Sequence, residues 1–528
     1  MAVIDGYAME FLVYLITTLV LTSISIYLFR TRNKHKVRLP PGPLALPIIG
    51  HLHLMSSIPH QSFQKLSNRY GPLIHILLGS VPCIIVSSPE VAKEVLKSQE
   101  LDFTSRPMSL AVNYLTYDSA DFIFAPYGPY WRFMKKLCMT ELLNGQILNQ
   151  FVPMRKEELR RFLKSIFNMS LLGKAINVRQ QVMRLTNNTI TRMMMNTRCS
   201  ETEDQAEQVI MVAQEATELA GTFNLSDYIG ICRHLDLQGF GRRMKDTRRR
   251  FDNIIDKIIM EHEEARSQKK KMGSTSDGGN NHGVKTLLDL LLDICEDEEA
   301  EVRLTKSNVK AFLLDLFLAG TDTSAVTIEW AMSELINNPS VLEKAREEMD
   351  LVVGKSRLVE ESDIPNLPYL QAIVKETLRL HPGAPLVLRA STRDCKLLGY
   401  DIPGNARTLV NVWAIGRDPK YWDNPLQFQP ERFMMIEDGK NKSSQIDVRG
   451  QHYQFLPFGS GRRICPGLTL GLQTVQMGLA SMIQCFEWKV GDGKHAKVDM
   501  EESASLTLPR AHHLICVPVP RLNPLPLT

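Results

Sequence analysis

The stretch "FGSGRRICPG", Phe458–Gly467, places one cysteine in a glycine-rich loop directly after two arginines. Glycines allow the backbone to bend tightly and to approach a bound group closely. The helix-like pattern "LTLGLQTVQMGLASMIQCF" follows Pro466. Cys465 therefore precedes a predicted helix N-terminus, where the helix dipole and the free N–H groups favour an anion. The loop suits a thiolate ligand, although on spacing alone a buried structural cysteine fits it as well.

A single thiolate restricts the kind of site. Without partner cysteines it cannot form an ordinary structural zinc site, but it can be the axial protein ligand of a heme iron and favour O–O cleavage. An arginine in the same loop can bind a heme propionate in bidentate fashion. The chain fills every position of the more specific pattern F-x-x-G-x-R-x-C-x-G, with Phe458, Gly461, Arg463, Cys465 and Gly467.

On this motif the chain resembles the cytochrome P-450 family, the heme-thiolate monooxygenases, in its plant endoplasmic-reticulum form. The resemblance implies heme b as the cofactor, with its iron ligated by the Cys465 thiolate and with Phe458, Arg463 and Gly467 beside the heme. It also implies the cytochrome P-450 fold, which is mainly α with small β-sheets.

The segment 309–336, "VKAFLLDLFLAGTDTSAVTIEWAMSELI", predicts a long helix. Asp315, Ala319, Asp322 and Thr323 share one face of it, at spacings i, i+4, i+7 and i+8. Gly320 costs about 1 kcal/mol relative to alanine in a helix interior, so it needs a reason. Together with Ala319 it would leave room for a heme and O₂ against the helix. On spacing alone, a packing seam of small residues beside a surface acid explains the pattern as well.

Cleavage of O₂ needs two protons delivered into a site that excludes bulk water, and an acid beside a hydroxyl can relay them. In the P-450 family, A-G-x-D-T is the oxygen-activation motif, and this chain reads "AGTDT". The resemblance therefore implies that Thr323 is the catalytic alcohol and that Asp322 is its acidic partner.

The segment "KETLRLHP" carries Glu376 and Arg379 at i, i+3, which alone is a common surface pair worth about 0.5 kcal/mol or less. In the family, this E-x-x-R pairs with the arginine of a later P-E-R-F, which is Arg432 here. The resemblance implies a buried charge network, in which the loss of one partner leaves the others buried and unpaired. We interpret the three residues as a structural support for the Cys465 loop.

The resemblance places three further residues beside the heme. "YWRFMKK" supplies Trp131 and, four residues later, Lys135, where the family usually has an arginine. A lysine offers a propionate a point charge instead of a bidentate fork. Arg389, in "PLVLRAS", matches the family's propionate-binding arginine. An ordinary surface cation is the alternative for Lys135 and for Arg389.

Longer stretches such as "VEESDIPNLPYLQAIVKETLRLHPG" resemble the plant subgroup that contains dihydroxypterocarpan 6a-monooxygenase and flavone synthase II. This resemblance implies hydroxylation of an apolar polycyclic plant metabolite, a flavonoid or a pterocarpan, with a triterpenoid as the alternative substrate. It places Leu316, Ala319, Leu388 and Leu506 at the substrate, and their apolar side chains suit such a ligand.

Two other functions share much of this pattern. A heme-thiolate isomerase or dehydratase needs no acid–alcohol pair, so Asp322 and Thr323 argue against it, and NADPH dependence distinguishes the two. A membrane-anchored heme-binding scaffold without turnover would lack catalytic residues, whereas nothing that catalysis needs is missing from the sequence.

The N-terminal region predicts a membrane anchor. "FLVYLITTLVLTSISIYLF", Phe11–Phe29, is 19 uncharged residues long, close to the roughly 20 that a bilayer-spanning helix needs. Positive charge stays on the cytosolic side of a membrane, and the cluster "RTRNKHKVR" follows the apolar run. We therefore expect a single-pass protein of the endoplasmic reticulum membrane with a cytosolic catalytic domain. A cleaved signal peptide would have a basic start and a shorter apolar core.

The chain is expected to divide into a luminal tip and anchor (1–29), a basic, proline-rich hinge (30–43) and a catalytic domain (44–528). Within the last, helical periodicity dominates, and short strands are predicted around a turn at Gly79–Ser80, near 396–412 and near the C-terminus. The net charge of +4 over 528 residues gives no sign of a nucleic-acid partner. Nine cysteines without a C-x-x-C favour free thiols in a reducing compartment.

The electrons for the reaction are expected from a partner protein. The sequence has no strand–G-x-G-x-x-G–helix unit for NADPH, and the short "GFGRR" at Gly239–Arg243 lacks that context. We expect NADPH–cytochrome P-450 reductase, with cytochrome b5 as a further candidate donor, to dock on a basic surface near the Cys465 loop. The remaining expected partners are the membrane and a small apolar substrate.

Overall fold

The computed structural model describes residues 37–199, 203–272, 285–434, 446–491, 497–522 and 524–526, with residues 13, 14, 17, 18 and 21 of the N-terminal region. Apart from these five residues, the expected anchor at Phe11–Phe29 lies outside the described residues, and so does the first half of the hinge. Within the described part, one helix is long and apolar enough to cross a membrane, Lys306–Asn337, and 78% of its most apolar window is buried inside the protein.

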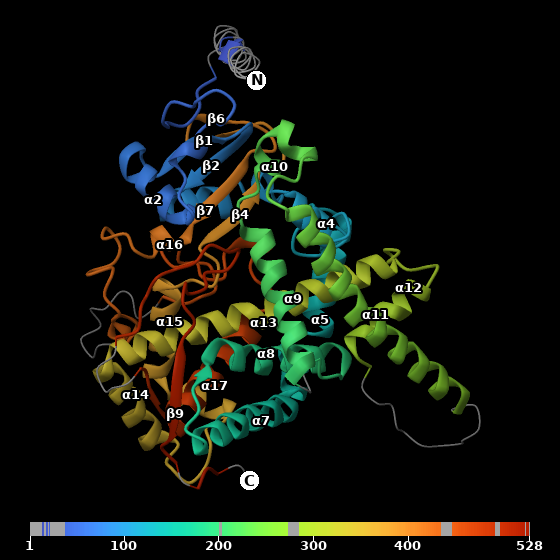
Figure 1. Ribbon diagram of the computed structural model, residues 1–528, viewed down its shortest axis with the longest axis vertical. Helices are drawn as coiled ribbons and strands as arrows, with labels where there is room; N and C mark the ends of the chain where they lie inside the picture. The colour runs from blue at the N-terminus through green and yellow to red at the C-terminus, as the bar shows by residue number, and fades with distance from the viewer. Residues whose placement is uncertain are drawn as a thin grey trace, which may run out of the picture.

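Helices dominate the described chain, as the sequence predicts (Figure 1). The α-helices are α2 Pro59–Tyr70, α3 Pro89–Lys93, α4 Leu110–Leu115, α5 Pro129–Glu141, α6 Gly145–Gln150, α7 Val152–Leu171, α8 Val178–Met195, α9 Glu203–Gly221, α10 Leu225–Tyr228, α11 Phe240–Met272, α12 Leu287–Glu296, α13 Lys306–Asn337, α14 Pro339–Val352, α15 Pro368–Leu380, α16 Val412–Ile415 and α17 Leu468–Cys485. Short helices of other types are η1 Leu52–Leu54, η2 Glu94–Ser98, η3 Glu100–Phe103, η4 Gly230–His234, η5 Glu361–Asn366, η6 Pro430–Phe433 and η8 Gly461–Arg463.

The strands form three small sheets. A four-stranded sheet has the order β1-β2-β7-β4, and β2 and β7 are its parallel pair. A three-stranded sheet has the order β3-β9-β8, and β5 pairs with β6. The strands are β1 Leu73–Leu78, β2 Val81–Val86, β3 Ile176–Asn177, β4 Leu386–Ala390, β5 Cys395–Leu397, β6 Tyr400–Ile402, β7 Arg407–Asn411, β8 Phe486–Lys489 and β9 Ile515–Pro520.

The strand predictions are confirmed in all three regions. The turn at Gly79–Ser80 joins β1 to β2, and Gly79 has φ of 57°, in the left-handed region that favours glycine. A Cβ at Gly79 would also collide with the carbonyl oxygen of Tyr228, the last residue of α10. The turn therefore needs glycine both for its backbone conformation and for the approach of α10.

The second half of the expected hinge is attached to the sheet. The Pro41 carbonyl accepts the His75 N–H of β1 (3.0 Å), and Arg38 and Asp401 exchange two hydrogen bonds of 2.8 and 2.9 Å. Residues 38–41 therefore lie on the surface of the folded domain.

Helix α13 crosses the middle of the molecule and packs against α8, α15 and α17 (Figure 1). Thr305 and Asn308 form a capping box at its start, which satisfies N–H groups that a helix N-terminus leaves free. At Gly320, a Cβ would lie 3.0 Å from Cγ1 of Ile190 on α8. The close packing of α8 is thus one reason for glycine at this position of α13.

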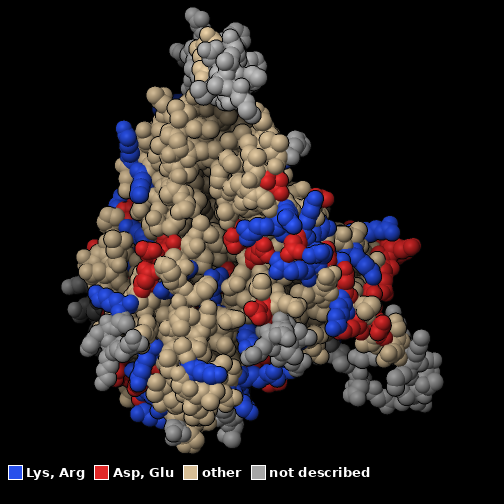
Figure 2. All heavy atoms as spheres, viewed as in Figure 1, with Lys and Arg blue, Asp and Glu red and all other residues tan. Residues whose placement is uncertain are grey.

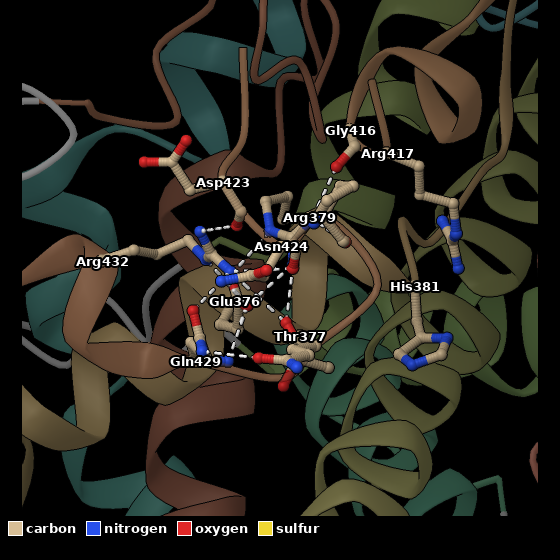
Figure 3. Close-up of polar contacts among 12 residues, drawn as sticks. Glu376, Thr377, Arg379, His381, Gly416, Arg417, Asp423, Asn424, Gln429 and Arg432 are labelled. Atoms are coloured by element: carbon tan, nitrogen blue, oxygen red, sulfur yellow. Dashed lines mark hydrogen bonds and ion pairs between the residues drawn. The ribbon is translucent and has the colours of Figure 1, made fainter. Parts of the chain in front are cut away.

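Glu376, Arg379 and Arg432 lie together in a buried network (Figure 3). The Glu376 carboxylate accepts Nε and Nη2 of Arg379 at 2.7 and 2.8 Å and Nε of Arg432 at 3.0 Å. Arg379 also donates to the carbonyls of Gly416 (2.6 Å) and Pro425 (2.7 Å). One end of α15 thereby holds the irregular chain that leads to η6.

Aromatic rings extend this support toward the Cys465 loop. Trp422 lies 5.3 Å from the Arg379 guanidinium and 6.3 Å from Phe455, and Phe433 lies 5.3 Å from Phe455. Phe455 precedes the loop by three residues. The buried charges and the rings thus connect α15 to the base of the loop that carries Cys465.

We predict that Arg379→Ala destabilises the folded chain by about 3–5 kcal/mol, because it leaves the Glu376 carboxylate buried with one partner fewer. The thermal unfolding midpoint, followed by circular dichroism, should fall well below that of the unmodified protein, and the purified variant should carry little heme.

Arg449→Ala is the matched control, since the Arg449 side chain is 77% exposed and its contact to Asp447 is 4.0 Å long. It should leave the midpoint unchanged. Equal midpoints for the two variants would show that the Arg379 network is not a support of the fold.

Candidate active site

The Cys465 loop has the backbone geometry that its glycines predict. Gly459 and Gly461 have φ of 72° and 74°, and a Cβ at Gly461 would collide with Glu100 of η3. The Cys465 N–H donates to the Phe458 carbonyl (3.0 Å). The loop therefore closes on itself immediately before α17 begins.

The surroundings of the Cys465 thiol change its pKa. Burial raises its pKa, and the N–H of Gly467 and the charge of Arg106 act in the opposite direction without cancelling the rise. The start of α17 alone thus does not outweigh desolvation. A coordinated metal cation does, because a thiol loses its proton when it binds one.

Two residues expose surface in places where their surroundings are buried. Ala319 is exposed in the middle of α13, although Phe317 and Thr321 beside it are buried. Cys465 is likewise exposed, yet its thiol is desolvated by the protein around it. Ala319 lies on α13, the helix that crosses the middle of the molecule (Figure 1).

Three arginines gather beside the Cys465 loop: Arg463 and Arg389 are buried and Arg106 is half-buried. Arg463 donates to the carbonyls of Ile123 (3.3 Å) and Ala125 (2.6 Å). Its buried Nε has no partner among the described residues.

Arg389 and Arg106 also contact main-chain carbonyls. Both donate to the Leu388 carbonyl, Arg389 at 2.9 Å, and Arg389 reaches the Ser460 carbonyl at 3.4 Å. In the part of the chain that the structure describes, none of the three arginines forms a salt bridge with a carboxylate. Asp121 acts on Arg106 and Arg463 only through its charge, and Glu100 acts on Arg389 in the same way, so the cluster has a surplus of positive charge.

The pKa values of the three guanidinium groups reflect this surplus of positive charge. Desolvation lowers the pKa of Arg463 to about 9 and that of Arg106 to about 10, and it lowers the pKa of Arg389 well below its ordinary value. The charge of Arg106 lowers the pKa of Arg389 and Arg463 further. Buried cations need an anion beside them. The two carboxylates of heme b meet this need, so the residues present fit the cofactor that the sequence predicts.

Trp131 and Lys135 of α5 lie at the same cluster. The Trp131 ring is buried, 4.6 Å from the Arg463 guanidinium and 5.2 Å from Nζ of Lys135. Lys135 donates to the Arg462 carbonyl, and burial lowers its pKa. The structure thus brings together residues from α5, β4 and the Cys465 loop that the sequence assigned to one heme.

Asp322 and Thr323 do not form the side-by-side pair that the sequence suggests. The Thr323 hydroxyl donates to the Ala319 carbonyl of its own helix (2.7 Å). Asp322 is fully buried, and its two oxygens accept from Arg179 (2.5 Å) and Thr507 (2.8 Å). Because neighbouring helical residues project about 100° apart, the acid faces α8 and the C-terminal chain. The expectation that one helix face presents both groups to the heme is therefore wrong for Asp322.

Asp315, which the sequence places on one helix face with Ala319, binds main-chain N–H groups of another segment. It accepts the N–H groups of Phe122 (2.7 Å) and Ile123 (2.9 Å). Burial and the neighbouring Asp121 carboxyl raise the pKa of Asp315 well above its ordinary value. Through these two bonds α13 fixes the chain whose Ile123 carbonyl accepts from Arg463 and Arg106.

Sequence reasoning missed Arg106. It stands alone in "TSRPM", outside every motif, and only the fold brings it to Arg389 and Arg463. The one local feature of Arg106 is the proline that follows it, which restricts the backbone before it to extended conformations. This feature does not indicate that the side chain joins a cluster of arginines.

The residues expected at the substrate lie around the same centre. Leu316 and Ala319 belong to α13, and Leu388 is a half-buried residue of β4. Leu506 is half-buried, and a Cβ at Gly221, the last residue of α9, would collide with its main chain. Helix α13, strand β4 and the chain before β9 therefore supply the four side chains, and α9 packs against the last of these segments.

Comparison with known proteins gives matches over nearly the whole chain. The family model described as Cytochrome P450 matches residues 40–517. A 3,9-dihydroxypterocarpan 6A-monooxygenase of Glycine max is 56% identical, over 94% of this chain and 96% of that protein. A beta-amyrin 24-hydroxylase of Glycine max is 48% identical over 99% of both chains. A solved structure of a zebra fish cytochrome P450 with abiraterone superimposes with a TM-score of 0.69, at 25% identity, over 88% of this chain and 100% of that chain.

These matches agree with the mainly helical fold, with the cysteine loop and with the cationic cluster. They give the chain heme with a thiolate-ligated iron as its cofactor, and monooxygenation as its reaction. The chain belongs to the cytochrome P450 family.

Proposed function

We propose that this chain hydroxylates an apolar polycyclic plant phenolic, a pterocarpan or a flavonoid, with one oxygen atom from O₂. The observation that carries the proposal is the 56% identity, over nearly the full length of both chains, to a protein named 3,9-dihydroxypterocarpan 6A-monooxygenase. The apolar side chains of Leu316, Leu388 and Leu506 support a ligand of this kind.

A triterpenoid is the second candidate substrate. It is favoured by the 48% identity to a protein named beta-amyrin 24-hydroxylase, which extends over 99% of both chains. Apolar contacts alone do not separate a pterocarpan from a triterpenoid, because both offer polycyclic apolar surface.

The substrate class is tested with the full chain in microsomes, NADPH and the reductase. Separate incubations contain 3,9-dihydroxypterocarpan, a flavanone and β-amyrin, and products are identified by mass. A product heavier by one oxygen atom is expected from a phenolic. Turnover of β-amyrin alone would overturn the phenolic class, and product formation without O₂ and NADPH would favour an isomerase or dehydratase.

The cysteine loop and the arginines hold the cofactor in this proposal. When bound, the heme supplies the activation of O₂. Cys465 provides the thiolate ligand of its iron, with Phe458 and Gly467 beside it. Arg389, Arg463 and Arg106 bind its two carboxylates, and this compensates the desolvation that lowers the pKa values of their guanidinium groups.

Trp131 and Lys135 complete the cofactor site from α5. Trp131 packs against the Arg463 guanidinium, which keeps that arginine in place for a carboxylate. Lys135 adds a point charge at the edge of the cluster. Glu376, Arg379 and Arg432 act from outside the site, because they hold the chain that leads to Cys465.

Thr323 and Asp322 supply protons in this proposal. Thr323 lies one helical turn after the exposed Ala319, with a hydroxyl that can exchange its bond to the Ala319 carbonyl for one to a reacting group. Asp322 delivers protons from the buried side of α13, where Arg179 holds its carboxylate.

We also propose a single-pass anchor at 1–29 and a hinge at 30–43, with the catalytic domain 44–528 on the cytosolic face of the endoplasmic reticulum. Exposed apolar side chains near the N-terminal end of the domain support a membrane there, among them Leu44 (89% exposed) and Ile231 of η4 (80% exposed). Figure 2 shows this end of the visible face as largely tan. Protease treatment of intact microsomes should digest the catalytic domain, whereas protection of the domain would contradict this topology.

Electrons come from NADPH–cytochrome P-450 reductase, and cytochrome b5 is a second candidate donor. Arg132 and Lys136 are exposed on α5, and Arg462 of the Cys465 loop is also exposed. Lys135, between the two α5 cations, donates to the Arg462 carbonyl, so the three side chains share one side of the molecule. This basic surface suits an acidic partner close to the heme.

We predict that Cys465→His abolishes the long-wavelength Soret band that reduced heme-thiolate proteins show with CO, because imidazole replaces the thiolate on the iron. Absorbance spectra of the reduced, CO-treated protein measure this. Cys395→Ser, on the distant strand β5, should keep the band. A band that survives in Cys465→His would remove Cys465 as the ligand.

We predict that Thr323→Ala uncouples the reaction, because protons are no longer guided by the hydroxyl. NADPH consumption should continue while hydroxylated product falls and hydrogen peroxide rises. Thr323→Ser should restore the ratio of product to NADPH consumed. An unchanged ratio in Thr323→Ala would place the proton supply elsewhere.

We predict that the double variant Arg132→Glu/Lys136→Glu raises the reductase concentration needed for half-maximal turnover, most strongly at low salt, since it reverses the charge of the docking surface. Arg161→Glu/Lys164→Glu is the control, because both residues are exposed cations of α7. Reductase titrations that coincide for the two double variants would contradict this surface, and turnover with NADPH but no reductase would contradict the need for a partner.

A further inference from the structure

The carboxylate of Asp322 is held from two sides by residues distant in sequence. Arg179 Nη2 lies 2.5 Å from Oδ1, and the Thr507 hydroxyl donates to Oδ2 at 2.8 Å. The exposed fractions of Arg179, Asp322 and Thr507 are 6%, 0% and 5%. A buried carboxylate with a charged and a neutral donor on separate oxygens has a fixed orientation.

Thr507 belongs to a segment that also reaches the substrate side of the molecule. We call residues 501–511, which lie between β8 and β9 in the chain, the C-terminal loop. The Leu508 carbonyl accepts Nε1 of Trp330 on α13 (2.7 Å), and the Leu508 N–H donates to the Gly383 carbonyl (3.2 Å). Directly after Thr507, the loop is thus fixed to α13 through Trp330 and to the chain after α15 through Gly383.

The neighbouring residue in this loop is Leu506, one of the residues assigned to the substrate. Its main chain lies so close to α9 that a Cβ at Gly221 would collide with it. The main chain at Leu506 therefore cannot move toward α9, and Leu506 is bonded directly to Thr507 in the same loop.

Thr323 does not take part in these contacts. Its hydroxyl donates to Ala319 within α13 (2.7 Å), so the orientation of Asp322 is set by Arg179 and Thr507 instead. Removal of the Thr507 hydroxyl would leave Oδ2 buried without that donor, and a buried acceptor without a partner either reorients or loses stability.

We propose that Thr507 is a positioning residue for Asp322. Its hydroxyl, together with Arg179, fixes the direction in which the carboxylate faces, so the loop that contacts substrate through Leu506 also governs the acid that supplies protons. This inference rests on the proposed role of Asp322 as that acid, and it adds the residue through which substrate contact and proton supply are connected.

The test compares Thr507→Val, which keeps the shape but lacks the hydroxyl, with Thr507→Ser, which keeps the donor. The control is Thr191→Val, because Thr191 is equally buried but donates within α8, to the Asn187 carbonyl (2.9 Å). All are made in the full chain with heme bound. The first readout is hydrogen exchange of the 501–511 segment, where the Ser503, Leu508 and Ala511 N–H groups are hydrogen-bonded.

Thr507→Val should speed exchange in this segment by about tenfold, the value of one hydrogen bond to a charged group. Thr507→Ser and Thr191→Val should exchange as the unmodified protein does. Unchanged exchange in Thr507→Val would overturn the inference, and this readout needs neither turnover nor a known substrate.

The second readout is the fraction of NADPH electrons recovered in product, with 3,9-dihydroxypterocarpan as the substrate. Thr507→Val should lower this fraction in the unmodified background and should have no further effect in Asp322→Asn, because the hydroxyl acts through that carboxylate. Equal losses in both backgrounds would overturn the inference alone. An Asp322→Asn protein with full coupling would overturn the role of Asp322 and this inference together.

Discussion

The structure depends most on three guanidinium groups, those of Arg106, Arg389 and Arg463, that lie within the protein and form no salt bridge among the described residues. Desolvation lowers the pKa of each, so the cluster is costly until an anion enters. Main-chain carbonyls accept hydrogen bonds from these guanidinium groups, but they do not neutralise the positive charge. The carboxylates of heme supply the opposite charge. Heme binding and folding stability are therefore coupled, since a ligand that binds only the folded state stabilises it.

The rest of the fold holds these charges and Cys465 at one place. The buried Glu376–Arg379 pair fixes α15 to the chain before η6, and the rings of Trp422, Phe433 and Phe455 continue this contact to the loop. From the other side, Asp315 of α13 fixes the chain at Phe122 and Ile123. The cysteine and the arginines thus lie between two rigid supports, and glycine positions allow the loop to approach η3.

The sequence predicts those parts of the site that are encoded locally. The cysteine loop, the turn at Gly79 and the E-x-x-R pair are short motifs whose spacing already determines their geometry. What it does not predict depends on contacts between distant segments. Arg106 has no motif. The partners of Asp322 are 143 and 185 residues away from it, so the helix face alone placed the acid wrongly. The packing of Gly320 against Ile190 is likewise beyond the sequence, because Ile190 belongs to another helix.

The central claim is that Cys465 and the three arginines bind opposite parts of one heme. A crystal structure of the full chain with its heme tests this most directly. The account predicts the Cys465 sulfur bonded to the iron, with guanidinium groups of Arg106, Arg389 and Arg463 at hydrogen-bond distance from the two heme carboxylates. A heme whose carboxylates point away from these arginines, or whose iron has another protein ligand, would contradict it.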